Sequence, residues 1–580
     1  MNRYCLLRFA NPKLYIVQQI IECVPNFSEG RNMDIIRQIT NEIESVDGVR
    51  LLNVDPGKAT NRTVVTFVGE PIAVIEAAYL AIKKAAELID MSKHKGEHPR
   101  MGATDVCPLI PIANISMEET AELARKLARR VGEHLHIPVY LYEAAAIIPG
   151  RNNLSEIRAG EYEGFFKKII LPEWKPDFGP IEMNVKAGAT VIGARDFLIA
   201  YNVNLNTTSV RRANSIAFDV RERGRVLREG DPISGKIVKD TEGNPVHVPG
   251  SLKAVKAIGW FIEEYGVAQI SMNLTNINIT PVHIAFDEVC RKADARGIRV
   301  TGSELVGLLP LNCLLDAGRY FLEKQQRSTG VSDQELIKIA VKSMGLDELG
   351  PFDPDKRVIE YLLKDAASEK LVNLSLKDFA NETSSESPAP GGGSISAYVG
   401  ALGVALGGMV ANLSSHKRGW DDRWKEFSDV AEKAEQIKKQ LIALVDEDTQ
   451  AFNRIMDAFA LPKGSEEEKI ARKSAIAEAT RFAINTPLKV MESSLASMDL
   501  LKAMAEKGNP NSVSDAGVGA LCARTAVLGA GLNVKINCSG FEDAEFVSKA
   551  LLKAENYIEQ AISKESEILK IVDQVIEKSA

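Results

Sequence analysis

The stretch Asn381-Glu-Thr-Ser-Ser-Glu-Ser-Pro-Ala-Pro-Gly-Gly-Gly393 divides this 580-residue sequence into two parts of different character. Its serines, prolines and glycines are typical of a break in regular structure. From there to the end of the chain, nearly every segment has apolar residues three or four positions apart, which is the period of a helix. The sequence therefore predicts an all-α C-terminal domain.

Upstream of this stretch, β-rich runs alternate with helical segments in two successive groups, which predicts two tandem α/β subdomains. We expect each subdomain to be an α+β sandwich of the ferredoxin-like kind. The first group should have strands at 20–27, 49–54, 62–68, 106–112 and 137–142, with helices at 72–91 and 116–135. The second should have strands at 197–205, within 257–276 and at 300–309, with helices at 209–223 and from residue 282.

These patterns predict five consecutive segments. They are an N-terminal extension (1–18), a first subdomain (19–197), a second subdomain (198–363), a linker (364–371) and the helical domain (372–580). At roughly 150 residues per domain, the chain is long enough for each domain to bury its own core.

Composition excludes several classes of protein. The net charge of -7 argues against a nucleic-acid partner. The uncharged stretch 391–415 is glycine-rich and predicts a buried helix rather than a membrane span. The cysteines are scattered and include no C-x-x-C pair, which indicates reduced thiols in a cytoplasmic protein; they are Cys5, Cys23, Cys107, Cys290, Cys313, Cys522 and Cys538.

The loop 91–105 gathers His94 and His98, two of seven histidines, with several charged residues. Histidine suits proton transfer near neutral pH, and nearby cations suit anionic substrates. Gly96 and Pro99 disfavour a continuous helix, and no third ligand has metal-site spacing, so we expect no metal. From composition alone, a solvated turn remains an alternative.

Long motifs in this half resemble those of the glutamate formiminotransferases. They are Glu22-Cys-Val-Pro-Asn-Phe-Ser-Glu-Gly30, Thr60-Asn-Arg-Thr63, Phe67-Val-Gly69, His94-Lys-Gly-Glu-His-Pro-Arg-Met-Gly102, Pro138-Val-Tyr-Leu-Tyr142, Ala159-Gly-Glu-Tyr162 and Gly193-Ala-Arg195. The resemblance spans about residues 20–363. It implies two α/β subdomains with folate held between them.

The resemblance also implies roles for individual residues. His98 would be the catalytic base, with His94 a supporting or solvated residue. The folate-contacting stretch corresponds to 179–188, with Gly179, Pro180, Lys186, Ala187 and Gly188 as its contacts. A segment that only links the two subdomains is the alternative for 179–188.

In the helical domain, Ala389-Pro-Gly-Gly-Gly-Ser394 leads into the small-residue helix. Amides exposed at a helix N-terminus can hold an anion, although a flexible linker is a plainer interpretation. Further on, Val430, Ala434, Ile437, Leu441, Leu444, Phe452, Ile455 and Phe459 form an apolar stripe.

Asp448 falls in the gap of this stripe. Burying a carboxylate costs desolvation energy, so we expect a partner, a raised pKa or a catalytic role. The structural alternative is an ion pair with Arg481 or Arg524.

The stretch Leu444-Val-Asp-Glu-Asp448, followed by Phe452, resembles the catalytic helix of the formiminotransferase-cyclodeaminase family over residues 372–580. The resemblance implies that Asp448 is catalytic. It also suggests that 508–515 forms another polar wall through Asn511 and Asp515. A helix-capping loop is the alternative for that segment.

Taken together, the resemblances imply a bifunctional enzyme of histidine degradation and one-carbon metabolism. It would transfer the formimino group from N-formimino-L-glutamate to tetrahydrofolate, as its polyglutamylated form, and then release ammonia to give 5,10-methenyltetrahydrofolate. We expect a homo-oligomer formed through the helical domain. A monofunctional transferase with a dimerising helical domain and a non-catalytic folate-binding protein are the alternatives.

Overall fold

The computed structural model describes residues 19–58, 60–96, 99–230, 235–362 and 371–579. The expected extension (1–18) and nearly all of the expected linker (364–371) lie outside these residues. The described chain forms two compact units. The first holds the described residues up to Cys313 and those from Met344 to the gap at 363. The second holds Leu314–Ser343 and the described residues from 371 onward.

The first subdomain contains a seven-stranded sheet in the order β1-β4-β2-β5-β7-β6, with β3 beside β4. Its elements are β1 (Ile20–Cys23), β2 (Asn26–Phe27), α1 (Met33–Glu44), β3 (Val49–Gly57), β4 (Arg62–Gly69), α2 (Pro71–Leu88), β5 (Thr104–Ala113), α3 (Met117–Leu135), β6 (Val139–Glu143), α4 (Leu154–Arg158), α5 (Glu161–Lys168) and β7 (Thr190–Ala194). Both β1 and β2 pair with β4 and β5, so they act as one broken strand. The elements from β1 to β5 therefore follow the ferredoxin-like β-α-β-β-α-β order.

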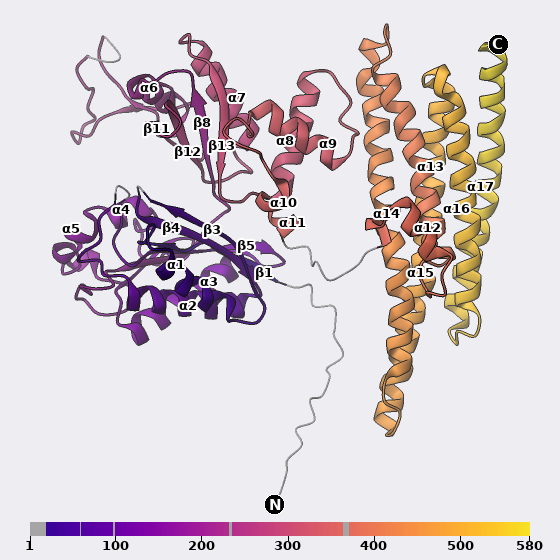
Figure 1. Cartoon of the computed structure of the whole chain (residues 1–580), viewed down its shortest axis with the longest axis horizontal. Coiled ribbons are helices and arrows are strands. Elements are labelled where there is room, and N and C mark those ends of the chain that lie inside the picture. The colour runs from indigo at the N-terminus through magenta and orange to yellow at the C-terminus, as the bar shows by residue number, and fades with distance from the viewer. Residues whose placement is uncertain (1–18, 59, 97–98, 231–234, 363–370, 580) are drawn as a thin grey trace, which may run out of the picture. The chain divides into compact units, whose positions relative to one another are not determined.

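Helices α1, α2 and α3 cover one face of this sheet (Figure 1). Helix α3 begins at the predicted capping box of Ser116 and Glu119. Ile21 and Cys23 of β1 belong to the core under these helices. Because neighbours on a strand point to opposite faces, Glu22 lies on the other face.

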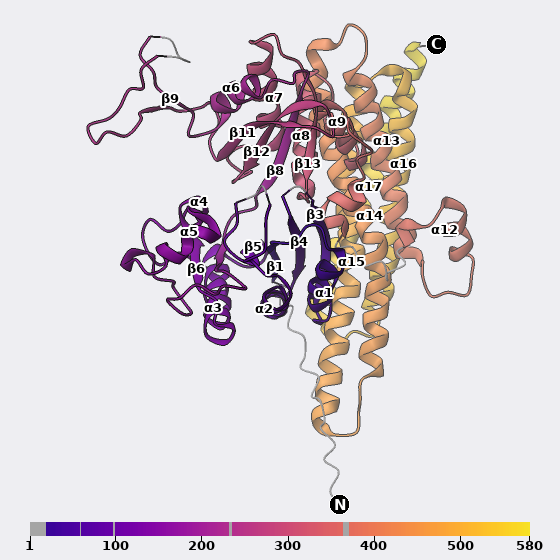
Figure 2. The same cartoon turned by 60° about the vertical axis from the view of Figure 1, so that its left-hand side comes forward.

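The second subdomain repeats this order in a four-stranded sheet, β11-β12-β8-β13. Its elements are β8 (Ile199–Leu205), α6 (Val210–Val220), β11 (Val255–Ile262), β12 (Val267–Leu274), α7 (Val282–Asp294) and β13 (Val300–Val306). An arm with β9 (Arg225–Val226) and β10 (His247–Val248) extends from it (Figure 2). Two tandem ferredoxin-like subdomains are thus confirmed.

The remaining chain is helical, as predicted. Its helices are α8 (Leu311–Lys324), α9 (Asp333–Met344), α10 (Pro354–Arg357), α11 (Ile359–Leu362), α12 (Leu376–Thr383), α13 (Gly392–Ser415), α14 (Trp424–Ala460), α15 (Glu466–Lys507), α16 (Val513–Cys538) and α17 (Ala544–Ser579). Gly403 and Gly519 let α13 and α16 touch, because a Cβ on either would lie within 2.9 Å of the other's carbonyl oxygen. The predicted break begins only after Thr383, since α12 includes residues 381–383.

Two helical segments are long and apolar enough to cross a membrane by length and composition, namely Gly392–Ser415 and Pro510–Cys538. In the first segment, 61% of the most apolar 18-residue stretch is buried inside the protein, as expected for a core helix. The apolar stripe of α14 differs from expectation, because Phe452 is 40% and Phe459 52% exposed. The α14–α15 hairpin extends beyond the neighbouring helices, which leaves this end of the stripe uncovered (Figure 1).

Most of α8 and α9 belongs to the helical unit, although the sequence placed these helices in 198–363. The loop between them docks on α13 and α14. Asn412 Nδ2 donates to Gly330 O at 2.9 Å, and Thr329 Oγ1 lies 3.1 Å from Ser428 Oγ. A Cβ on Gly330 would lie 2.3 Å from the carbonyl carbon of Ala431. The periodicity of the sequence does not reveal this docking. The domain boundary near residue 363 stays a prediction.

Candidate functional site

The motif segments of the first subdomain converge on the loop between α2 and β5. The Asn61 side chain accepts from Gly30 N and donates to Lys95 O, both at 3.0 Å. Gly96 packs so closely that a Cβ there would lie 2.2 Å from Thr60 O. Three motifs that are distant in sequence therefore form one structure.

His94 holds this loop in place. Its Nε2 lies 2.9 Å from Asn61 O, and its Nδ1 accepts from Arg100 Nε at 3.4 Å. A carbonyl can only accept, so Nε2 carries the proton. Burial lowers the pKa of His94, and Arg100 adds to that effect. A neutral His94 fits the supporting role that the sequence suggested.

Arg100 connects the loop with the Ala159–Tyr162 motif and with Glu163 next to it. Its guanidinium lies 3.0 Å from Glu161 Oε2 and 2.7 Å from Glu163 Oε1. These two carboxylates raise the pKa of Arg100, mainly through the hydrogen bond to Glu163.

A buried carboxylate, Asp105, gathers two further guanidinium groups. Its Oδ1 accepts from Met101 N at 3.0 Å, and its Oδ2 pairs with Arg62 and lies 2.8 Å from Arg158 Nη2. The Nε atom of Arg158 is buried and makes no hydrogen bond with a described residue, whereas its Nη2 atom is held in the ion pair with Asp105. Arg158 could not be found from the sequence, because nothing in its spacing links it to Asp105. Guanidinium groups beside the motif loop suit a substrate that carries carboxylates.

His98, the predicted catalytic base, lies outside the described residues, as does Glu97. The described loop ends at Gly96 and resumes at Pro99. The role of His98 stays a prediction.

Three of the five predicted folate contacts lie against the motif loop. Lys186 O accepts from Met91 N at 2.9 Å, and Ala187 O accepts from Ala103 N at 2.7 Å. Gly188 adopts φ +74°, which favours glycine. The Lys186 amine donates to the carbonyl oxygen of Glu87, at the end of α2, at 2.6 Å.

Gly179 and Pro180 lie elsewhere. Gly179 adopts φ +88°, and a Cβ there would lie 2.4 Å from Ile137 O, between α3 and β6. The segment 179–188 is no linker between the subdomains, because β7 of the first sheet follows it.

Both sheets carry buried polar groups on the face opposite to their helices. Burial raises the pKa of Glu22 to about 7, which Arg195 partly offsets. On the second sheet, Gln269 donates to Asn204 at 2.7 Å and to Glu304 at 3.4 Å. Such groups suit the polar parts of a ligand. Sequence alternation alone did not reveal them.

In the helical unit, Asp448 meets the start of α13. Its Oδ2 accepts from both Ser394 N (2.8 Å) and Ser394 Oγ (2.9 Å). A Cβ on Gly393 would lie 2.1 Å from Asp448 Oδ1, so only glycine fits there. The exposed amides and the dipole at a helix N-terminus favour a negative charge at this position.

Burial raises the pKa of Asp448, and the hydrogen bonds from Ser394 act against this rise. The expected ion-pair alternative does not occur. Arg481 pairs with Asp543 at 2.6 Å, and Arg524 lies 3.8 Å from Glu565.

Other polar groups lie around Asp448. Glu447 pairs with Lys489 at 2.7 Å, and Asn533 Nδ2 lies 3.4 Å from the Cβ position of Gly392. Pro487 inside α15 cannot donate to Ala483 O, which instead accepts from Asn537 Nδ2 at 2.8 Å.

Asn511 and Asp515 do not line this site within one chain. Their segment lies at the other end of α13, where Asn509 N donates to Ser414 Oγ at 2.8 Å. At 1.5 Å per residue, Ser414 is about 30 Å from Ser394. The Asn509 side chain caps the turn Pro510–Ser512, so the capping-loop alternative holds.

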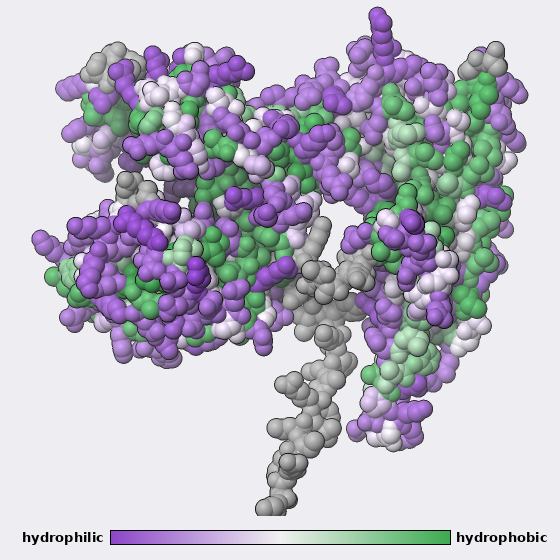
Figure 3. Space-filling view, viewed as in Figure 1, coloured by the Kyte–Doolittle hydropathy of each residue, from purple (hydrophilic) through white to green (hydrophobic). Residues whose placement is uncertain are grey.

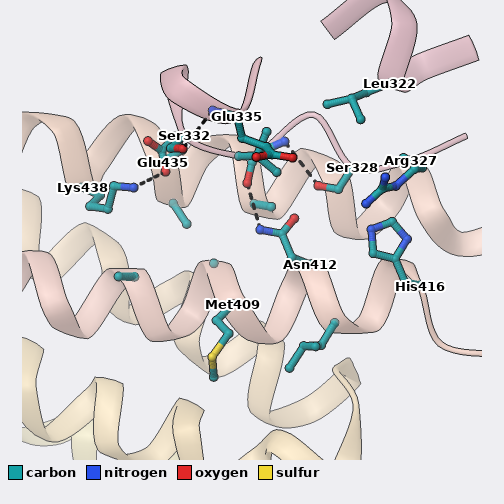
Figure 4. A pocket seen from close by; sticks show the side chains of 17 residues that line it. Leu322, Arg327, Ser328, Ser332, Glu335, Met409, Asn412, His416, Glu435 and Lys438 are labelled. Carbon is teal, nitrogen blue, oxygen red and sulfur yellow. Dashed lines mark hydrogen bonds and ion pairs between the residues drawn. The ribbon is translucent and has the colours of Figure 1, made fainter. Parts of the chain in front are cut away.

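A cavity of about 480 Å³ also lies at that distant end (Figure 4). Arg327 and His416 lie near one another on one side. Lys438, on the other side, pairs with Glu435 at 2.5 Å. The cavity belongs to the place where the α8–α9 loop docks and is separate from Asp448.

Among the described residues, no group of three or more His, Cys, Asp or Glu side chains is arranged to hold a metal ion. Both candidate sites consist of hydrogen-bonding and ionisable side chains.

Both parts of the chain match known protein families. The formiminotransferase N-terminal subdomain matches residues 20–195, the formiminotransferase domain matches 200–364, and the formiminotransferase-cyclodeaminase model matches 375–556. The chain is 42% identical to formimidoyltransferase-cyclodeaminase of Mus musculus over 546 residues, which cover 94% of this chain and 97% of the mouse protein.

Two shorter relatives match separate parts. A glutamate formimidoyltransferase of Thermoplasma acidophilum is 44% identical and covers 52% of this chain and 92% of its own length. A methenyltetrahydrofolate cyclohydrolase of Methylorubrum extorquens is 36% identical and covers 33% of this chain and 91% of its own length. Because the match to the mouse protein spans nearly the full length of both proteins, this chain belongs to the formimidoyltransferase-cyclodeaminase family.

Proposed function

We propose that this chain carries out both reactions of its family at two separate sites, one at the motif loop of the first subdomain and one at Asp448. The first reaction moves the formimino group of N-formimino-L-glutamate to N5 of tetrahydrofolate and leaves glutamate. The second closes the folate ring, giving 5,10-methenyltetrahydrofolate and ammonia. The full-length match to a bifunctional relative supports this assignment.

In the transfer, N5 attacks the amidine carbon and loses a proton, which the imidazole of His98 accepts. The positive charge of the Arg158 guanidinium, which is paired with Asp105 beside the loop, supports recognition of a glutamate carboxylate there. Folate binds between the two subdomains, against Gly179, Pro180, Lys186, Ala187 and Gly188. The position of Lys186, Ala187 and Gly188 beside the motif loop supports this for these three residues, while Gly179 and Pro180 rest on the resemblance.

In the ring closure, N10 attacks the formimino carbon, and the bond to the departing nitrogen breaks as ammonia leaves. Asp448 assists by covalent attack, by proton transfer or by stabilising the amidinium. One observation carries this assignment. Asp448 is a partly buried carboxyl with a raised pKa, and its hydrogen bonds within the described chain come from Ser394.

The deciding experiment assays the purified full-length protein separately with formiminoglutamate plus tetrahydrofolate and with 5-formiminotetrahydrofolate. We expect turnover in both and ammonia in the second. Transfer without ammonia release would instead identify a monofunctional transferase. Hydrolysis of methenyltetrahydrofolate should be measured alongside, because one relative is named for that reaction.

The same proposal includes a cytoplasmic homo-oligomer that uses polyglutamylated folate. Apolar surface covers parts of the helical unit (Figure 3). On α16, Val518, Leu521, Leu532 and Ile536 are 42–69% exposed and share one side of the helix. Light scattering should show an oligomer, and Leu532→Lys with Ile536→Lys should dissociate it. An unchanged mass would place the interface elsewhere.

A further inference from the structure

A cavity of about 510 Å³ lies at the tip of the α14–α15 hairpin, next to the connection between α16 and α17. Four cations line it, namely Lys463, Lys469, Arg472 and Lys473, against the single carboxylate of Glu542. Phe459 and Phe541 supply aromatic surface. In a chain with a net charge of -7, this local excess of positive charge favours an anionic ligand.

The four cations are not equally engaged. Arg472 donates to Phe459 O at 3.1 and 3.3 Å and so satisfies a carbonyl at the end of α14. Lys469 and Lys473 form exposed pairs with Glu466 (2.6 Å) and Glu542 (2.8 Å). Such pairs contribute little and exchange easily. Lys463 makes no hydrogen bond or ion pair with a described residue, so it is the cation most available to a ligand. Lys473 comes next, because its side chain is 72% exposed against 54% for Lys469.

An apolar track connects this cavity with Asp448. Phe452, Ile455 and Phe459 follow Asp448 by four, seven and eleven residues, which places all of them on one side of α14. The two phenylalanine rings are 40% and 52% exposed. Eleven residues of helix span about 16 Å. Exposed apolar side chains that gather on one side of a helix form a patch, and such patches are typical of binding surfaces.

A ligand for this arrangement has its reacting nitrogens at one end, a flat ring in the middle and carboxylates at the far end. Folate has this order, with the N5 and N10 pair, an aminobenzoyl ring and glutamate. We propose that the hairpin-tip cavity binds the glutamyl carboxylates of 5-formiminotetrahydrofolate, while the aminobenzoyl ring lies against Phe452 and the glutamyl chain passes Phe459. This inference rests on the cyclodeaminase function proposed for Asp448.

The test uses the full-length double variant Lys463→Gln/Lys473→Gln. We expect its KM for 5-formiminotetrahydrofolate to rise about 5- to 30-fold, with kcat within about twofold, since two exposed charge contacts are lost. The difference should shrink at high salt. Lys425→Gln/Lys433→Gln removes the same charge near the other end of α14 and should leave KM unchanged. A second variant, Phe452→Ser, should also raise KM with little loss of stability, because that ring is half exposed.

Direct binding separates this inference from the proposed function. The probe p-aminobenzoylglutamate should bind Asp448→Asn as it binds the wild type, and should bind the Lys463→Gln/Lys473→Gln variant more weakly. An active wild type with unchanged KM in that variant overturns the inference. A variant that loses kcat and changes oligomeric state also overturns it, because the hairpin tip is then a contact between copies. A wild type that releases no ammonia overturns the proposed function instead.

Discussion

Ser394 donates two hydrogen bonds to a single oxygen of Asp448, one from its backbone N–H at 2.8 Å and one from its hydroxyl at 2.9 Å. The hydroxyl also lies 3.0 Å from Val445 O, so its one proton serves two acceptors in turn. This contact fixes the start of α13 against α14. It also explains the glycine before Ser394, since any side chain at Gly393 would collide with Asp448 Oδ1.

Asp448→Asn should abolish ammonia release and leave the fold intact. The asparagine oxygen can still accept both Ser394 bonds, but the amide cannot act as nucleophile or base. We expect at least about a 100-fold loss of rate and an unchanged or higher melting temperature. Glu447→Gln is the matched control, because Glu447 neighbours Asp448 but pairs with Lys489. An active, destabilised Asp448→Asn enzyme would contradict the assignment.

The stability of the same variant should depend on pH in a defined direction. Burial raises the pKa of Asp448. Between the ordinary carboxyl pKa and this raised value, the folded state binds more protons than the unfolded state, so wild-type stability falls as pH rises. The Asp448→Asn variant has no carboxyl group at this position, so its stability does not fall in this way. The stability advantage of Asp448→Asn over wild type should therefore grow as pH rises through that window, as denaturant titrations at several pH values can measure. A constant difference would contradict the raised pKa.

Ser394→Ala should shift the pH profile of ammonia release. Hydrogen bonds to an ionised carboxylate lower its pKa, and this change removes the hydroxyl while keeping the backbone donor. We expect the pKa of Asp448 to rise further, which moves the acid limb of the profile to higher pH if the carboxylate form is active. Ser396→Ala is the control, because Ser396 Oγ donates to Gly392 O instead. A lower rate with an unmoved profile would mean that Ser394 acts in another way.

Local patterns predicted the secondary structure well, because their causes are local. The capping box of Ser116 and Glu119 marks the start of α3, and alternating groups of strands and helices produced both ferredoxin-like subdomains. Periodicity placed Phe452 and Phe459 on one side of a helix, and this is correct. It could not tell that they are exposed, because exposure depends on where neighbouring helices end.

The candidate sites were predictable only in part, for the same reason. Asp448 was found because a charge interrupts an apolar stripe, but its partner Ser394 lies 54 residues away. Arg158 and Asp105 meet through the fold, and neither spacing nor composition connects them. Asn511 and Asp515 have suitable chemistry, but within one chain their segment lies at the end of α13 that is far from Asp448.

His98→Ala should lower transferase turnover by about 100-fold or more, the usual effect of losing a general base. Ammonia release from 5-formiminotetrahydrofolate should stay nearly intact, because Asp448 lies in the helical unit. His94→Gln should cost less, since His94 holds the loop through Asn61 O and is assigned no proton transfer. Parallel assays of both reactions on both variants test this, and normal transfer by His98→Ala would remove the assignment.

Gly330→Ala should destabilise the full-length protein but not a transferase fragment ending near Lys364. In the full chain, the new methyl group would lie 2.3 Å from the Ala431 carbonyl carbon, so the α8–α9 loop must move away from α14. Overpacking of this kind typically costs about 1–3 kcal/mol. In the fragment, α13 and α14 are missing, and residue 330 has open space. We expect the fragment to fold and transfer, as supported by the Thermoplasma acidophilum relative, which matches only 52% of this chain. Melting curves of the full-length protein and of the fragment, each with and without Gly330→Ala, test this prediction. If the fragment is insoluble, α8 and α9 need the helical unit to fold, and the predicted boundary near residue 363 is wrong.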